Sequence, residues 1–167
     1  MIAAAIQPHP AHPPHRSEYR GRPFTASDVA RYCALLAALS PEDVRLRFHS
    51  VTAPSDPELI RTAVLGPGSL GAVLVERRAG ELVGVAHAAP ANAERRGEFG
   101  ILVAAPHRRR GLGGALTDAL LRTMAARGFT RAEAYTAWEN HAAAALLRSR
   151  RFRPQHVGGG LIRWQLG

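Results

Sequence analysis

The chain has 167 residues, 46% of them hydrophobic, and a formal net charge of +9. This length suits a single folded domain, which we place at residues 16–167, and the apolar content excludes wholesale disorder. No apolar run approaches the roughly 18 residues that a membrane span needs, and the first residues lack the charged region of a signal peptide. A lone cysteine, Cys33, excludes an internal disulfide and indicates a reducing, cytoplasmic location.

The basic excess favours a polyanionic ligand. All 22 residues counted as lysine or arginine are arginines, because the chain contains no lysine. The arginines are scattered and aromatic residues make up 6% of the chain, so stacking platforms for single-stranded nucleic acid are scarce. We therefore treat nucleic-acid binding as a minor alternative.

Residues 1–15 form a segment rich in Pro, His and Ala that has no hydrophobic periodicity. This composition predicts a disordered tail. His9, His12 and His15 recur at every third position, which would place them on one face of a polyproline II helix. That spacing allows weak metal binding, but chance spacing in a flexible tail is the simpler interpretation, and we predict no metal site.

The first half of the chain shows a strand pattern, then helical spacing of apolar residues, then two more strand patterns. Ser27-Asp28 and Ser40-Pro41 supply helix start signals: a capping side chain in each case, and a proline at the first helical position in the second. The expected elements, in chain order, are a strand at 17–24, helices at 29–39, 41–48 and 57–65, and strands at 71–77 and 81–88.

The second half alternates strands and helices after a loop at 89–97. One apolar stripe runs along the helix that ends at Gly128, a glycine placed as a C-terminal cap. The expected elements are a strand at 98–103, a helix at 112–128, a strand at 131–136, a helix at 140–149 and, after a glycine hinge at 158–160, a strand at 161–166.

The segment 103–114, V-A-A-P-H-R-R-R-G-L-G-G, is the most informative about chemistry. It has the pattern of a strand end, a turn, a glycine-rich loop and a helix start. Such a loop directs free backbone N–H groups and the positive end of a helix dipole at one point, which favours a phosphate. The glycines fit neither G-x-G-x-x-G nor the lysine-containing loop of P-loop nucleotide-binding proteins.

Arg108, Gly111 and Gly113 do fit R-x-x-G-x-G, and this loop resembles the acyl-CoA loop of the Gcn5-related N-acetyltransferases (GNAT). The segment 140–147, followed by Arg151-Phe152, is similar to the family's second signature, with arginine where glycine is usual. The segment 39–49 resembles the first helices of the bacterial protein-lysine acetyltransferase branch.

The resemblance implies an α/β (α+β) fold with a central mixed sheet, mostly antiparallel, flanked by helices and splayed at the acetyl-CoA site. Acetyl-CoA would be the co-substrate. Its pantetheine arm would pair with the backbone of Ile101, Leu102 and Val103, and Asn140 would touch that arm or cap the final helix. The residues expected to contact its phosphates are Arg108, Arg109, Arg110, Gly111, Leu112, Gly113 and Gly114.

Acetyl transfer requires an amine to lose a proton before it attacks the thioester. Glu98 is the leading candidate for the general base, and it matches the glutamate used in the protein-acetyltransferase branch. His87 is a less favoured alternative. Many relatives place a tyrosine acid where this chain has Leu147, and Tyr135 is a poor substitute for it.

The sequence therefore predicts an acetyl-CoA-dependent N-acetyltransferase that modifies a protein lysine. Two alternatives stay open: acetylation of a small amine such as a polyamine or aminoglycoside, and an acyl-CoA-binding module without activity. No membrane partner is expected, and the sequence does not decide between a monomer and a homodimer.

Overall fold

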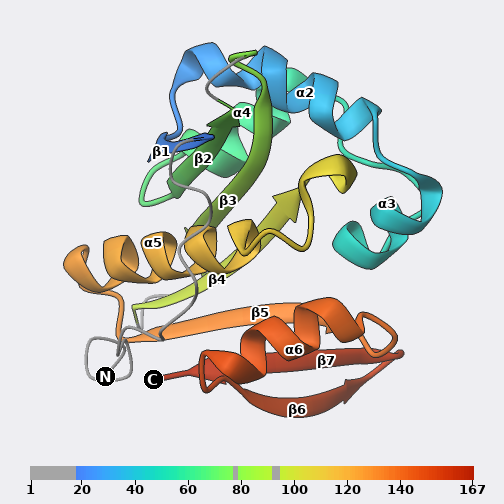
Figure 1. Ribbon diagram of the computed structural model, residues 1–167. Helices are drawn as coiled ribbons and strands as arrows, with labels where there is room; N and C mark the ends of the chain where they lie inside the picture. The colour runs from blue at the N-terminus through green and yellow to red at the C-terminus, as the bar shows by residue number, and fades with distance from the viewer. Residues whose placement is uncertain (1–17, 77–78, 92–94) are drawn as a thin grey trace.

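The computed structural model describes residues 18–76, 79–91 and 95–167 (Figure 1). The predicted tail at residues 1–15 lies outside these described residues, and so does the predicted start of the domain at residue 16. None of the described helices is long and apolar enough to cross a membrane.

The described strands form one seven-stranded sheet with the order β1-β2-β3-β4-β5-β7-β6. Neighbouring strands are antiparallel throughout, except that β4 and β5 are parallel and joined through a helix. The predicted mixed, mostly antiparallel sheet is thereby confirmed. The strands are β1 (Tyr19–Pro23), β2 (Leu70–Glu76), β3 (Leu82–Pro90), β4 (Arg96–Val103), β5 (Arg131–Ala137), β6 (Arg153–Gly158) and β7 (Leu161–Leu166).

Helices cover both faces of the sheet, and each face has its own apolar core (Figure 1). Helices α5 and α6 contribute to one core, and α2 and α4 contribute to the other. The α-helices are α2 (Val29–Ala37), α3 (Pro41–Phe48), α4 (Pro57–Leu65), α5 (Leu112–Ala126) and α6 (His141–Ser149), with short 3₁₀ turns η1 (Ala26–Asp28) and η2 (Ala105–His107).

Local capping explains where the helices that reach the site begin. Ser40 accepts a hydrogen bond from the backbone N–H of Asp43, and Pro41 occupies the first turn of α3. Asn140 caps α6 in the same way, through the N–H of Ala143. Both helix starts lie within a residue of the positions that the sequence predicts.

Three features of the sheet differ from the sequence-based expectation. All six residues of β6 are exposed at the sheet edge, so their sequence does not alternate between apolar and polar residues. The sequence pattern therefore does not predict this strand. The glycines at 158–160 make the hairpin turn between β6 and β7, with φ values of 85°, 60° and 73°, instead of a hinge. The predicted loop at 89–97 is shorter, because Ala89 pairs with Glu98 and Pro90 with Gly97.

The pairing of β4 with β5 is brief, and this determines where a site can form. The two strands are in register at Arg96 with Arg131, Gly97 with Ala132 and Glu98 with Glu133. Beyond Glu98, β4 continues beside β3, while β5 continues beside β7. The sheet therefore splits after Glu98.

Candidate active site

A cleft of about 660 Å³ lies where β4 and β5 separate. Its walls come from α3, most of β4, the second half of β5 and α6. Glu98 lines this cleft together with Val103 and Gly113, so the cleft extends from the split in the sheet to the glycine-rich loop. The structure thus brings the predicted base and part of the predicted cofactor loop into one cavity.

The glycine-rich loop ends in an uncapped helix start. Gly111 is the N-cap of α5 with φ 77°, a left-handed conformation that glycine adopts without steric cost, and Arg109 is also left-handed at 62°. The first backbone bond into the helix runs from the N–H of Ala115 to the carbonyl of Gly111, at 3.0 Å. Within the described chain, no backbone or side-chain acceptor takes the preceding N–H groups, those of Leu112, Gly113 and Gly114.

Two of the three loop arginines have protein partners for their side chains. Arg108 donates from Nε to the carbonyl of Val103 at 2.9 Å, and its Nη1 lies 2.8 Å from Oδ1 of Asp43. Arg110 donates to the hydroxyl of Tyr19 at 3.0 Å and lies 3.6 Å from a carboxylate oxygen of Glu18. Arg109 is exposed at the loop. The loop is therefore tied to α3 and β1, and the backbone N–H groups are its free donors.

Gly114 has a packing role in addition to any contact with a ligand. A Cβ built on Gly114 would overlap Nη2 of Arg150, which lies across the first turn of α5. Arg150 is held there by Asp118, with Nε 3.1 Å from Oδ1. At Gly113, by contrast, a Cβ would meet only Leu146, at the ordinary contact distance of 3.6 Å.

The end of β4 keeps its side chains in the cores and leaves one backbone edge without a neighbouring strand. Leu102 is buried in the core under α2 and α4, while Ile101 and Val103 pack against the core under α5. No ladder pairs residues 101–103 with β5. This edge can therefore accept the amide groups of an extended ligand, as the sequence-based interpretation expects.

Two carboxylates stand side by side where the sheet splits. Glu98 is exposed in the cleft, and among the described residues its carboxylate has no hydrogen-bond or ion-pair partner. Its ladder partner Glu133 is buried, lies 3.4 Å from Nη1 of Arg96 and accepts a 2.7 Å hydrogen bond from Gln165. Glu98 is thus the carboxylate that remains available to take a proton.

Asn140 and Leu147 extend the cleft wall along α6. The side chain of Asn140 accepts from the N–H of Ala143 at 3.0 Å, and its amide donates to the carbonyl of Leu46 at 3.5 Å. The capping interpretation of Asn140 is thereby confirmed, and the residue also joins α6 to α3. Leu147 is buried in the core, and Tyr135 is half-buried in the cleft wall.

The sequence analysis did not single out the side chains that α3 adds to the cleft. Asp43 and Arg47 are four residues apart, so they share one face of the helix, and both line the cleft. Burial lowers the pKa of His49, at the end of α3, and Arg47 acts the same way, while the Tyr135 backbone and Glu98 oppose them. The spacing of Asp43 and Arg47 could have shown that they share a helix face, but not what that face contacts.

His87, the alternative base, is less suited to the task than Glu98. It pairs with Gly100 across β3 and β4 and does not line the cleft, within the part of the chain that the structure describes. Burial, with a smaller contribution from Arg47, lowers the pKa of His87 to about 3. Its imidazole is therefore neutral and holds a proton only weakly.

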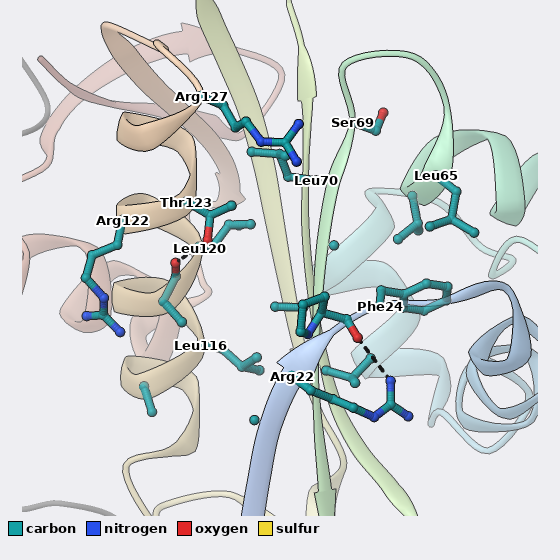
Figure 2. Close-up of a pocket in the computed structure, with 18 of the residues that line it drawn as sticks. Arg22, Phe24, Leu65, Ser69, Leu70, Leu116, Leu120, Arg122, Thr123 and Arg127 are labelled. Carbon is teal, nitrogen blue, oxygen red and sulfur yellow. Dashed lines mark hydrogen bonds between the residues drawn. The ribbon is translucent and has the colours of Figure 1, made fainter.

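A second hollow, of about 630 Å³, lies between α5 and strands β1 and β2 (Figure 2). Its charged lining residues are Arg22, Arg122 and Arg127, and no described acidic side chain or histidine lines it. Figure 2 shows Arg22 bonded to a backbone carbonyl, which is that of Pro23 at 3.0 Å. This hollow offers no general base, and we place the chemistry in the cleft at β4 and β5.

Comparison with known proteins identifies the family. The sequence model of the acetyltransferase (GNAT) family matches residues 36–152, which is most of the chain, and the chain therefore belongs to this family. It is an N-acetyltransferase, and acetyl-CoA is its co-substrate. No curated protein matches the chain.

Solved structures share the fold at low sequence identity. A phosphinothricin acetyltransferase from Sinorhizobium meliloti, in complex with AcCoA, is 22% identical with TM-score 0.75, covering 89% of this chain and 88% of that one. A ribosomal-protein-alanine N-acetyltransferase from Brucella melitensis is 23% identical with TM-score 0.72, covering 88% and 98%. A spermidine N-acetyltransferase from Vibrio cholerae, in complex with CoA and spermine, is 18% identical with TM-score 0.72, covering 90% and 96%.

Proposed function

We propose that this acetyltransferase transfers the acetyl group of acetyl-CoA to the side-chain amine of a lysine in another protein. The amine attacks directly within a ternary complex, and Glu98 is the general base. The observation that carries the proposal is the position of Glu98, an unpartnered carboxylate in the cleft at the residue where β4 leaves β5. Glu98 is therefore next to the stretch of strand edge that is free to hold the cofactor.

The free N–H groups at the start of α5 support a site for the phosphates of acetyl-CoA. A helix N-terminus with three unused donors is a favourable place for a pyrophosphate. From there the pantetheine arm would follow the backbone edge of residues 101–103 toward Glu98, passing Asn140 on α6. The loop arginines would add positive charge around the phosphates, while Arg108 and Arg110 also hold the loop in place.

The reaction removes two protons from the amine nitrogen and supplies one to the CoA sulfur. Glu98, directly or through a water molecule, takes the proton of the attacking ammonium, and the free amine then forms a bond to the thioester carbon. Backbone N–H groups of the β4 edge would stabilise the negative charge on the carbonyl oxygen. The nitrogen of the tetrahedral adduct loses its second proton to solvent, and the carbon–sulfur bond breaks. The CoA thiolate takes a proton from solvent, because Leu147 stands where many relatives have a tyrosine acid.

A lysine of a protein is favoured as acceptor by two features. The segment 39–49, which forms α3 and its flanks, resembles the bacterial protein-lysine acetyltransferase branch. A polyamine, in contrast, would need several free carboxylates, and the carboxylates of Asp43 and Glu133 are already paired with Arg108 and Arg96. Acetyl-CoA and protein lysines meet in the cytoplasm, which is where we place the protein.

The acceptor is tested with a lysine-rich protein pool and acetyl-CoA, by following release of the CoA thiol and locating the acetyl groups by mass spectrometry. We expect CoA release that depends on the protein pool, with acetyl groups on lysine side chains. The enzyme itself contributes no lysine signal, because the chain has none. CoA release with small amines but none with proteins would overturn the lysine assignment and leave acetyl transfer standing.

A further inference from the structure

Arg47 presents a guanidinium in the cleft, at the end of α3 nearest to Glu98. It lies directly against β4, since a Cβ built on Gly100 would overlap its Nη2 and crowd its Nη1. Gly100 is two residues beyond Glu98 on the same face of the strand. Strand geometry puts the two Cα atoms about 7 Å apart. Arg47 and Glu98 thus occupy neighbouring positions along one wall.

No described carboxylate forms an ion pair with Arg47. Its Nε is buried without a hydrogen-bond partner, and no ion pair joins Arg47 to any carboxylate of the described chain. The guanidinium does lie over the ring of Phe48, at 4.9 Å from the centroid. Burial lowers the pKa of Arg47, with Tyr32 and Glu98 opposing it, but an arginine side chain remains charged in proteins. Arg47 is half-buried, but its buried Nε–H without an acceptor is costly, and an anionic ligand would remove that cost.

Two arginines beside the glycine-rich loop differ from Arg47, because each has a carboxylate partner. Arg108 is paired with Asp43, and Arg150 is paired with Asp118. His87, the ladder partner of Gly100, has a buried Nδ1 without a partner, but its imidazole is neutral and supplies no negative charge. Glu98 affects Arg47 through its charge but forms no ion pair with it, so a direct anionic partner for the guanidinium would come from a ligand.

The position of Arg47 indicates which ligand supplies it. Asp43, one turn earlier on α3, faces Arg108 of the glycine-rich loop, where the phosphates of acetyl-CoA are proposed to bind. Arg47 lies at the opposite end of α3, toward Glu98, where the acceptor amine is proposed to react. The proposed phosphate site and the proposed acceptor site thus lie toward different ends of α3, and Arg47 is at the acceptor end.

We propose that Arg47 binds a carboxylate of the acceptor, so that the enzyme selects amines whose acidic group can reach Arg47 when the nitrogen is at Glu98. This inference rests on the proposed function. The carboxylate has two chemical sources: an acidic residue beside the acceptor lysine of a protein, or the acceptor's own carboxylate in a free amino acid. Both would form a charge-assisted, two-point contact with the guanidinium.

The test compares acceptors that differ only in this charge. One arm uses peptides in which the lysine is flanked by glutamate or by glutamine, and the other uses 6-aminohexanoate and 6-aminohexanamide. Each is assayed with the wild-type protein, with Arg47→Met, with Arg47→Lys and with the control Arg31→Met, which removes an exposed arginine on α2. Calorimetric binding of the acetylated products of both arms, each in its acidic and its amide form, provides a reading that needs no turnover.

We expect the wild-type protein and Arg31→Met to show KM values about tenfold or more lower for the acid in at least one arm, with similar kcat. Arg47→Met should lose this preference, and Arg47→Lys should keep part of it. The arm that shows the preference identifies the source of the carboxylate. Equal KM values for acid and amide in both arms, or a preference that persists in Arg47→Met, would overturn the proposal.

Two further outcomes separate this inference from the proposed function. If Arg47→Met lowers kcat equally for acids and amides, Arg47 acts on the thioester and the proposal is wrong. If no amine is acetylated by any variant, the proposed function fails, and product binding still decides the role of Arg47. Equal affinity for the acid and amide products in both arms would overturn that role as well.

Discussion

Nη1 of Arg108 lies 2.8 Å from Oδ1 of Asp43, an ion pair that joins the glycine-rich loop to helix α3. The same guanidinium donates to the carbonyl of Val103, so one side chain connects the strand edge, the loop and the cleft wall. Burial would raise the pKa of Asp43, but the hydrogen bonds from Arg108 and Ser40 outweigh it and hold that pKa below its usual value. The cofactor side of the cleft is thereby held in one geometry.

Replacing Asp43 by Asn should weaken acetyl-CoA binding more than it weakens the fold. The pair is partly exposed, so its loss should change the free energy of unfolding by about 1 kcal/mol or less. The loop would lose its connection to α3, and we expect the KM for acetyl-CoA to rise about threefold to tenfold, with a smaller change in kcat. Urea denaturation and steady-state kinetics measure the two effects. An unchanged KM would show that the pair does not position the loop.

Gly111 and Gly113 should respond in opposite ways to alanine. Gly111→Ala forces an alanine into a left-handed conformation and should lower the free energy of unfolding by about 1–2 kcal/mol. Gly113→Ala places a methyl group in ordinary contact with Leu146 inside a helix, and should leave the stability unchanged or raise it by up to about 1 kcal/mol.

Gly113→Ala should nevertheless raise the KM for acetyl-CoA, because the new methyl group would stand beside the free N–H groups that are proposed to bind phosphate. This variant therefore separates binding from folding. A variant as stable as the wild type with an unchanged KM would argue against close approach of the cofactor at this glycine.

The ion pair of Arg22 with Asp28 should be the most sensitive electrostatic contact for stability. Asp28 is fully buried and receives both Nη atoms of Arg22 at 2.6 Å, and these bonds hold its pKa at about 2. Arg22→Met leaves a buried carboxylate without its cation, which should cost about 3–5 kcal/mol. Arg45→Met, which breaks two exposed pairs, should cost about 1 kcal/mol or less. Equal losses in the two variants would contradict this assignment.

His87 should make stability depend on pH in a defined window. Its pKa is lowered from 6.5 to about 3 in the folded protein, so unfolding takes up a proton between these values. The free energy of unfolding should therefore fall as the pH decreases below 6.5, by about 1.4 kcal/mol per pH unit from this group. His87→Gln should remove that part of the slope between about pH 6.5 and 4.5, as measured by urea denaturation. Parallel pH dependences of the free energy of unfolding in the two proteins would exclude this contribution of His87.

The sequence predicts most of the fold and the cofactor half of the cleft, because those features have local signals. Ser40 and Asn140 begin helices by capping them, and Gly111 marks the turn into α5. Strand β6 has no such signal, since an exposed edge strand does not alternate in polarity. Its pairing with β7 in the structure identifies it as a strand.

The acceptor half of the cleft depends on contacts between distant segments. Arg47 meets Gly100 because α3 packs across the split in the sheet, and no pattern near either residue reveals that contact. The same holds for Glu98 and Glu133, which become neighbours through the parallel register of β4 and β5. Glu98 itself was predicted from a resemblance, and the structure supplies its surroundings.

The role of Glu98 is tested most directly by measuring kcat for acetyl transfer and the calorimetric Kd for acetyl-CoA in Glu98→Gln. Glu81→Gln, at an exposed glutamate outside the cleft, is the matched control. We predict that Glu98→Gln lowers kcat by roughly 10²–10⁴-fold with little change in Kd, while Glu81→Gln behaves as the wild type. A kcat close to that of the wild type in Glu98→Gln would contradict the assignment of Glu98 as the base.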